Sequence, residues 1–297
     1  MRYARADLDL KRQALAQVFP DVLGAPKAGT MALHGTELTK SLGHRLARYQ
    51  CKVCGRTFSN RTESDDARQH RPDINKLLPR LLCSGVTMRR AAWILACSYN
   101  TVRARSAWLA DRARLAHREA LAAGEHDTSY IQFDEMQTFE HAAAKALTIA
   151  VAIRWKTGKL LAARVGRIPA NGHLAELGKT KYGWTTNESA AACKAALTLA
   201  GQAAKPEVTV ACDRATTYPG LVASAFPAGV SVVPYKSRSF GGSADFDPLF
   251  KLNHACAKIR ADLACMARKT WATTKKREKL QDRLDIYIAV NNGYSFT

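Results

Sequence analysis

Residues 130–141, YIQFDEMQTFEH, form a run that suits a β-strand. The stretch carries an acidic pair, Asp134 and Glu135, in its middle. Successive side chains of a strand point to opposite faces of its sheet, so we expect Glu135 to face away from Asp134, toward solvent or a base. A carboxylate on a half-buried strand costs free energy unless it is paired or holds a metal ion. The stretch therefore predicts a core strand with a compensating group beside it.

The segments that follow predict a mixed α/β domain. Residues 146–155 and 158–167 predict two further strands, which form an antiparallel meander with the first. The remaining elements are expected, in chain order, as a helix over 187–202, a strand over 207–213, a helix over 217–226, a strand over 229–235 and closing helices over 249–270 and 275–291. Crossovers through helices imply parallel pairing of the later strands.

The predicted strand over 207–213 also ends in a carboxylate, that of Asp213. The carboxyl ends of parallel strands are where open α/β sheets place their sites, and two neighbouring carboxylates repel unless a divalent cation lies between them. Magnesium takes such oxygen ligands, with waters and phosphates completing its shell. We therefore expect Asp134 and Asp213 to share Mg²⁺. Two simpler roles stay open: Asp134 accepts hydrogen bonds at a strand edge, and Asp213 caps the helix that begins near Thr216.

The charge of the chain predicts an acidic partner. The 297 residues include 45 Lys and Arg against 25 Asp and Glu, a net charge of +20, and such a surplus is typical of proteins that neutralise nucleic-acid phosphates. No run of about 18 apolar residues occurs, which favours a soluble, cytoplasmic protein without membrane contact. Eight scattered cysteines with a single CxxC pair indicate a reducing compartment.

The CxxC pair, Cys51 and Cys54 in CKVCGRTF, has the spacing of one zinc knuckle. The positions where a second knuckle would place its cysteines hold Ala25 and Ala28. Three explanations of this half site stay open: the zinc has been lost, the site was altered by substitution, or the missing ligands are His34 and His44. A pair of buried thiols in a short hairpin is the simpler alternative.

Residues 73–123 are expected to be helical throughout. Thr87 suits the N-cap of a helix that turns Ala91, Ala92 and Leu95 inward, and the chain breaks at Cys97-Ser98 before a second helix. This spacing favours a helix-turn-helix whose second helix enters the major groove of DNA. The side chains expected to contact DNA are Asn100, Arg103 and Arg105. An ordinary helical hairpin with a solvated basic face is the alternative.

Five motifs in this order resemble insertion-sequence transposases of the DDE class, in particular relatives of the smallest bacterial insertion elements. They are CKVCGRTFS, TMRRAAWILACSYNTVRARS, FDEM, ACDRATTYPGL and LNHACAKIRADLACMARKTWATTKK. The resemblance covers roughly residues 20–292. It implies a degenerate zinc-ribbon-like module within residues 1–61, a helix-turn-helix domain over 73–123 and an RNase H-like catalytic domain over 128–297. It also implies double-stranded DNA partners (element ends and target), a homo-oligomer on that DNA, and a location at the bacterial nucleoid.

The resemblance assigns catalytic roles residue by residue. Asp134 and Asp213 match the first and second catalytic acids, which hold Mg²⁺ or Mn²⁺. The third position, a Glu in most such families and an Asn in some, holds Asn253, followed by the basic residues Lys258 and Arg260. An Asn carbonyl oxygen can still coordinate the metal but supplies no charge. Alternatives for the third ligand are Asp245, Asp247 and Asp262, with His254 as a ligand or phosphate contact.

The C-terminal run from Lys258 to Arg283 holds nine basic residues against three acids. Beside a magnesium site it predicts contacts to the DNA backbone, although a solvated helix face is the simpler explanation. The candidates in its second half are Arg268, Lys269, Lys275 and Lys276.

Three functions follow from these features. The first is an active transposase that cleaves and joins DNA strands, and it is the one we favour. The second is a DNA-binding regulator of the same descent with impaired catalysis, which the departures at Ala25, Ala28 and Asn253 favour. The third is a structure-specific nuclease on the same fold.

Overall fold

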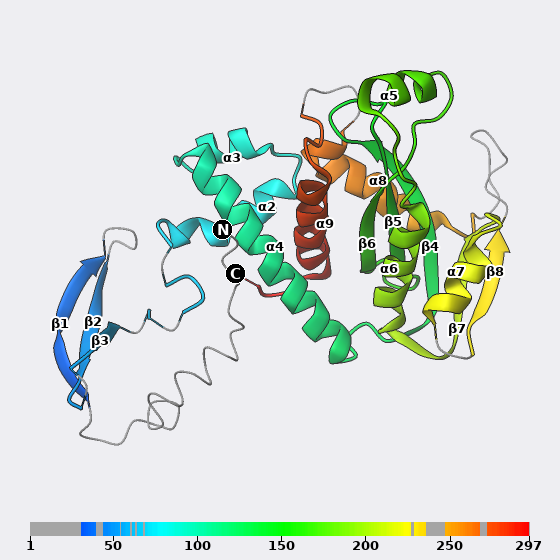
Figure 1. The fold of residues 1–297 in the computed structure, drawn as a ribbon. Helices are drawn as coiled ribbons and strands as arrows, with labels where there is room; N and C mark the ends of the chain where they lie inside the picture. Colours follow the sequence, from blue (N-terminus) through cyan, green and yellow to red (C-terminus); the bar gives the residue numbers. More distant parts are fainter. Residues whose placement is uncertain are drawn as a thin grey trace. The chain divides into compact units, whose positions relative to one another are not determined.

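The computed structural model describes residues 31–39, 44–53, 55–59, 61–62, 64–67, 69–226, 229–235, 247–267 and 272–296. They belong to two compact units, Met1–Ile74 and Asn75–Thr297 (Figure 1). Most of the segment expected to form the helix-turn-helix falls in the same unit as the expected catalytic domain. In the part of the chain that the structure describes, no helix is long and apolar enough to cross a membrane.

The first unit contains a three-stranded antiparallel sheet in the order β1-β2-β3. Its strands are β1 (Met31–Thr39), β2 (His44–Cys51) and β3 (Thr57–Ser59). Tyr49 of β2 lies opposite Phe58 of β3, and their rings stack with centroids 5.7 Å apart. A turn closed by the bond from the Gly55 N–H to the Cys51 carbonyl, 2.9 Å long, follows β2. The segment after the CxxC motif therefore folds back as a hairpin.

A five-stranded mixed sheet forms the centre of the second unit. Its strands are β4 (Thr128–Phe139), β5 (Ala146–Arg154), β6 (Leu160–Arg167), β7 (Ala204–Asp213) and β8 (Ser231–Tyr235), in the order β6-β5-β4-β7-β8. β4, β5 and β6 pair antiparallel, whereas β4, β7 and β8 run parallel. These pairings confirm the expected meander and the expected parallel pairing of the later strands.

Helices connect and cover these strands. In chain order the described helices are η1 (Pro72–Asn75), α2 (Leu78–Leu82), α3 (Met88–Ile94), α4 (Tyr99–Ala122), α5 (Leu174–Tyr182), α6 (Ser189–Gly201), α7 (Tyr218–Ala225), α8 (Phe250–Asp262), η2 (Ala264–Met266) and α9 (Arg277–Asn292). The sequence predicts no element at α5, which lies in the connection between β6 and α6. The others lie in or at the edges of segments that were expected to be helical.

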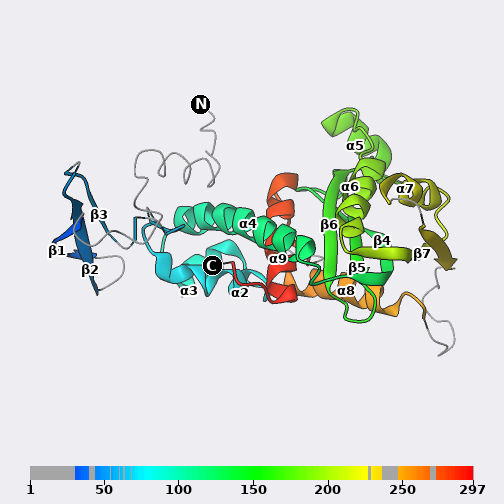
Figure 2. The ribbon, with the colours of Figure 1, turned by 90° about the horizontal axis from the view of Figure 1, so that it is seen from below.

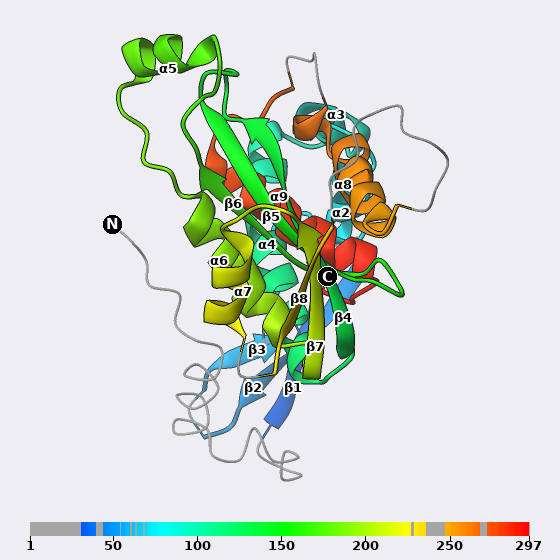
Figure 3. The same cartoon turned by 90° about the vertical axis from the view of Figure 1, so that its right-hand side faces the viewer.

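The sheet lies between two layers of helices, and successive side chains of β4 point toward opposite layers (Figure 3). Ile131 and Phe133 point into an apolar cluster that includes side chains of α6 and α7. Gln132, between them in sequence, points to the other face. Its amide nitrogen donates to the Pro248 carbonyl at 2.6 Å, and its amide oxygen accepts from the Leu252 N–H at 3.1 Å. Gln132 thereby fixes the start of α8 on the face opposite α6 and α7.

The two helices α3 and α4 begin as expected. The Thr87 hydroxyl oxygen accepts a hydrogen bond from the Arg90 N–H at 3.3 Å, and the Ser98 hydroxyl oxygen accepts from the Thr101 N–H at 3.1 Å. Side-chain caps of this kind satisfy N–H groups that have no partner within the helix. α4 then continues for 24 residues and packs against α9 (Figure 2). α4 therefore connects the α3–α4 pair to α9, which packs against β6 of the sheet.

β6 is an edge strand whose free backbone groups are bonded by side chains of α9. Gln281 accepts from the Val165 N–H and donates to the Ala163 carbonyl, each at 3.0 Å. Asn292 accepts from the Leu160 N–H at 3.1 Å and donates to the carbonyl of the same residue at 2.8 Å. The two side-chain amides form the hydrogen bonds that a further strand would form at this edge, and they thereby block pairing of the edge with another chain.

Candidate active site

Asp134 of β4 and Asp213 of β7 lie side by side. The two strands are parallel neighbours, and Gln132 lies opposite Ala211. Asp134 lies two residues after Gln132, and Asp213 lies two residues after Ala211. The two aspartates therefore lie on the same face of the sheet, toward the carboxyl-terminal ends of both strands. The structure therefore brings together the two acids that strand alternation and parallel pairing predict to be close.

The surroundings of Asp134 disfavour its negative charge. Burial raises its pKa from 3.8 to about 6, and the nearby charges of Asp213 and Glu135 act in the same direction. Two donors to its Oδ1 oppose this shift: the Glu135 N–H at 2.7 Å and the Tyr218 hydroxyl at 3.3 Å. A carboxylate in this position is stabilised by a nearby positive charge, because an opposite charge favours the ionised form.

Asp213 is held by the loop that follows β7. Its Oδ1 accepts a hydrogen bond from the Ala215 N–H at 3.0 Å. The N-cap of α7 is Thr217, and no side chain bonds the first turn of that helix. The alternative that Asp213 caps this helix is therefore wrong, because its bond closes the turn before the helix. One carboxylate oxygen is engaged in that turn.

Asn253 lies at the start of α8, on the face of the sheet that carries Asp134. Cys256, one turn later, is buried, and its pKa is raised to about 12 by burial and by the charge of Asp134. The Asn253 amide nitrogen donates to Asp247 Oδ2 at 2.9 Å. A carboxylate can only accept here, so this bond fixes the orientation of the amide and leaves its carbonyl oxygen turned away from Asp247. The bond to Asp247 therefore engages the amide nitrogen of Asn253 and not its carbonyl oxygen.

The other candidates for the third position have structural partners. Asp247 also accepts from the Leu249 N–H at 2.9 Å, so both of its oxygens are engaged. Asp262, at the far end of α8, accepts from the Tyr287 hydroxyl at 2.8 Å. The His254 ring stacks on that of Phe250, with centroids 6.1 Å apart. Asp245 lies outside the described residues.

Glu135 is half-buried, so the expected contact with solvent is only part of its surroundings. It points away from Gln132 and Asp134 as the pleat requires, but the opposite face is covered by α6 and α7. Its Oε1 accepts from the hydroxyls of Thr148 and Ser189, each at 2.8 Å, and its Oε2 accepts from the Tyr218 hydroxyl at 3.3 Å. Three protein hydroxyl groups thus bond this carboxylate in addition to the solvent that we expected.

The predicted DNA contacts on α4 separate into exposed and buried side chains. Asn100 and Arg103 are exposed. Arg105 is only 6% exposed, and its guanidinium lies 5.7 Å from the centre of the Trp108 ring. Arg105 falls on the buried stripe of the helix, which recurs every three to four residues as Val102, Arg105, Ser106 and Leu109. The expectation that Arg105 is free to contact DNA is therefore wrong.

The basic residues of the C-terminal run differ in exposure. Lys258, Lys275 and Lys276 are exposed, and Arg260 is half-buried. The Lys258 ammonium lies 3.5 Å from the Asn291 side-chain oxygen. Arg268 and Lys269 lie outside the described residues. The Lys275 ammonium lies 3.2 Å from the Thr273 hydroxyl, and the three lysines remain exposed to solvent.

The zinc prediction remains untested. Cys51 ends β2 and is half-buried, and His34 of β1 is exposed. The other positions of the motif, Cys54, Ala25 and Ala28, lie outside the described residues, as does the His44 side chain. Over the described ranges no group of three or more His, Cys, Asp or Glu side chains is arranged to hold a metal ion. A cation between Asp134 and Asp213 would thus need further oxygen ligands from an amide, water or phosphate.

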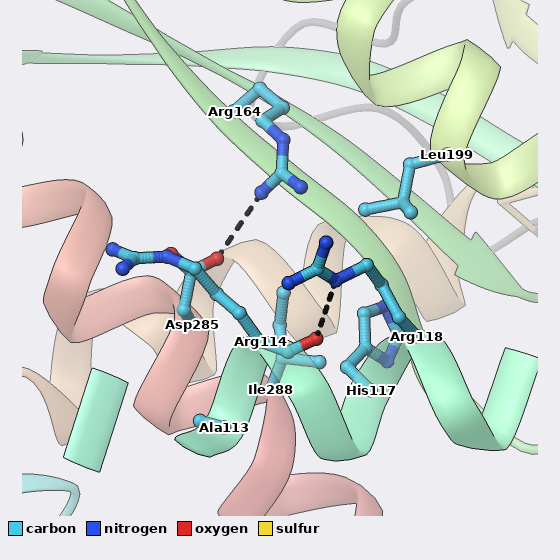
Figure 4. Close-up of a pocket in the computed structure, with 8 residues that line it drawn as sticks. All are labelled: Ala113, Arg114, His117, Arg118, Arg164, Leu199, Asp285 and Ile288. Atoms are coloured by element: carbon cyan, nitrogen blue, oxygen red, sulfur yellow. Dashed lines mark hydrogen bonds and ion pairs between the residues drawn. The ribbon is translucent and has the colours of Figure 1, made fainter. Parts of the chain in front are cut away.

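A pocket of about 220 Å³ at the β6 edge is lined by side chains of α4, β6, α6 and α9 (Figure 4). Arg118 donates to the Arg114 backbone carbonyl at 3.3 Å. Asp285 accepts from Arg114 at 2.7 Å and from Arg164 at 3.2 Å, and Arg114 also bonds Asp282. These pairs tie α4 and β6 to α9. The pocket therefore marks a structural junction.

No family model matches the sequence, and no curated protein matches it. Among solved structures, the chain is similar to one described as "Crystal structure of the Mos1 Strand Transfer Complex". The TM-score is 0.30 and the sequence identity is 14%, over 68% of this chain and 66% of that one. The chain thus spans slightly less than two thirds of the length of that protein. A likeness this distant does not assign a function.

Proposed function

We propose that this chain is a DNA transposase with an RNase H-like catalytic domain, which cleaves and joins DNA strands at the ends of an insertion element. The observation that carries the proposal is the half-buried pair of Asp134 and Asp213 at one end of two parallel strands. Carboxylates that are held together against their mutual repulsion indicate a cation site more than a role in stability.

The chain's own residues suit a hard divalent cation. Asp134 and Asp213 would hold magnesium or manganese, with the Asn253 carbonyl oxygen as a neutral third ligand. Such a cation, when bound, activates the attacking oxygen and stabilises the leaving oxygen in phosphoryl transfer. Gln132 sets the position of α8, and with it that of Asn253, because it bonds the backbone at Pro248 and Leu252.

DNA binding is proposed from charge and exposure. The net charge of +20 favours a polyanion, and α3 and α4 form a capped helix pair with Asn100 and Arg103 exposed at the start of the second helix. Lys258, Lys275 and Lys276 would add contacts to phosphates. We propose double-stranded DNA as the partner, both at element ends and at the target, with a homo-oligomer assembled on it at the bacterial nucleoid.

A second function is a DNA-binding regulator of the same descent with impaired catalysis. The observation in its favour is Asn253, which supplies no charge where most related enzymes would have a carboxylate. A structure-specific nuclease on the same fold is the third candidate. It would cleave DNA without joining the ends to a target.

One assay separates the three. Linear DNA that carries the sequences flanking the chain's own coding region is incubated with the protein, a target plasmid and Mg²⁺, and both cleaved ends and joined products are measured. A transposase gives cleavage and joining, a nuclease gives cleavage alone, and a regulator binds without either. Asp134→Asn should abolish cleavage and leave DNA binding intact. Asn253→Ala should depress cleavage strongly, whereas Asn253→Glu should retain or raise it by restoring the commoner acid.

A further inference from the structure

Tyr218, the first residue of α7, lies between the two carboxylates of the acidic pair on β4. Its hydroxyl is 3.3 Å from Asp134 Oδ1 and 3.3 Å from Glu135 Oε2. The side chain is only 3% exposed, although it ends in a polar group. A hydroxyl in this position carries one proton for two carboxylate acceptors, so it joins Asp134 and Glu135 into one hydrogen-bonded unit.

Two contacts fix the tyrosine in place. Its ring packs edge-on against Phe133, with centroids 5.1 Å apart, inside the apolar cluster beneath the sheet. Its backbone N–H donates to the Ala215 carbonyl at 3.2 Å, and the Ala215 N–H in turn bonds Asp213. The same short loop therefore places both the Asp213 carboxylate and the Tyr218 hydroxyl.

Glu135 is anchored independently of the tyrosine. Thr148 of β5 and Ser189 in the first turn of α6 both donate to its Oε1, at 2.8 Å. The start of a helix also favours a negative charge. Among the described residues, no Lys or Arg forms an ion pair with Glu135. The carboxyl group is therefore held in place by hydroxyl groups and lies close enough to Asp134 to raise the pKa of that side chain.

The bonds around Asp134 distinguish its two oxygens. Oδ1 accepts from the Glu135 N–H and from Tyr218, whereas Oδ2 has no hydrogen-bond partner within the described residues. A carboxylate with one oxygen occupied by donors keeps the other for a ligand. Partners that orient a ligand in this way typically contribute a factor of about 10–100 in metal affinity.

We propose that Tyr218 is a positioning residue, which Glu135 holds in place and which orients the Asp134 carboxylate so that Oδ2 faces a bound divalent cation. This inference rests on the proposed function, because it concerns the same site.

The test measures Mn²⁺ binding to the full-length protein by electron paramagnetic resonance, together with the Mg²⁺ concentration that gives half-maximal DNA cleavage. The variant is Tyr218→Phe, which keeps the ring contact and removes only the hydroxyl. The matched control is Tyr287→Phe, because Tyr287 is also 3% exposed and its hydroxyl also donates to an aspartate, Asp262, outside the site. We expect Tyr218→Phe to weaken both metal readouts by about 10-fold with DNA affinity unchanged, and the control to leave all three unchanged.

Each outcome decides the inference. A folded Tyr218→Phe variant with wild-type Mn²⁺ affinity overturns it, and so does an equal loss in the control, which would mark a general effect of losing a buried hydroxyl. If Tyr218→Phe does not fold, Thr148→Val removes one anchor of Glu135, and unchanged Mn²⁺ affinity in that variant overturns the proposal. Wild-type protein that neither binds Mn²⁺ nor cleaves DNA overturns the proposed function itself. Cleavage by the wild type with no effect of Tyr218→Phe refutes only the role of the tyrosine.

Discussion

Replacing Asp134 by Asn should raise the stability of the metal-free protein at pH 7. Burial raises the pKa of Asp134 from 3.8 to about 6. A shift of one pKa unit corresponds to about 1.4 kcal/mol, so the ionised side chain costs the folded state about 3 kcal/mol at neutral pH. Asn removes the charge, keeps nearly the same volume, and retains an oxygen that can accept from the Glu135 N–H and the Tyr218 hydroxyl.

The sign of the pH dependence follows from the direction of this shift. The pKa in the folded state lies above the value in the unfolded chain, so between those two values the folded protein binds more protons. The cost is therefore present in full above about pH 6 and declines as the pH falls toward 3.8. We expect the gain from Asp134→Asn to shrink from about 3 kcal/mol at pH 7 to less than about 1 kcal/mol near pH 4.

The assay is urea unfolding with a chelator present, on wild type and variant at both pH values. Added Mg²⁺ should then stabilise the wild type and leave the variant unchanged, because a ligand that binds only the folded state stabilises it. A variant that is less stable than the wild type at pH 7, or a gain that does not depend on pH, would refute the reasoning about the burial of this charge.

Three further predictions concern other parts of the chain. Arg103→Ala should weaken DNA binding and reduce its salt dependence, both measured by fluorescence anisotropy. Arg105→Ala should instead lower the free energy of unfolding by about 1–2 kcal/mol, because the packing of this buried side chain is lost. Equal losses of DNA affinity in the two variants would contradict this assignment. Asn292→Ala should cost about 3 kcal/mol in urea unfolding, because it leaves two buried backbone groups of Leu160 unbonded; a loss below about 0.5 kcal/mol would rule out its role at the strand edge. Zinc content by mass spectrometry should be below one ion per chain, since the CxxC pair supplies only two ligands; one chelator-resistant zinc per chain would contradict it.

The core of the site could be predicted from the sequence because it depends on regular backbone geometry. Alternation along β4 fixes the face of Asp134, and the helical crossover implies that β7 runs parallel to β4. The structure then shows that β7 is the neighbour of β4, which brings Asp213 beside Asp134. The same reasoning predicts the opposite direction of Glu135. It does not predict what covers Glu135, because Thr148, Ser189 and Tyr218 come from three separate elements.

Arg105 shows where composition alone misleads. A basic residue near the start of a helix favours a nucleic-acid contact, but the rotation of α4 is set by Val102 and Leu109, which are fully buried. Arg105 lies on the same stripe and is buried with them. The spacing of the apolar residues could have revealed this, because a position three residues after Val102 and four before Leu109 lies on their face of the helix.

α5 had no detectable signal, for a physical reason. Only one of its nine residues, Gly178, is buried, so no apolar stripe marks its sequence. Gly178 is required by a close approach: an added Cβ would lie 2.9 Å from the Ala144 carbonyl oxygen. Such a contact between distant segments cannot be read from local sequence patterns.

The measurement that tests the central claim most directly is metal rescue of DNA cleavage by Asp213→Cys. A thiolate is a poor ligand for Mg²⁺ and a better one for the softer Mn²⁺. If Asp213 binds the catalytic cation, the wild type should cleave with either metal, and Asp213→Cys should cleave with Mn²⁺ and lose cleavage with Mg²⁺ while it still binds DNA. Cleavage by Asp213→Cys at the wild-type rate in Mg²⁺, or no cleavage by the wild type with either metal, would contradict the account.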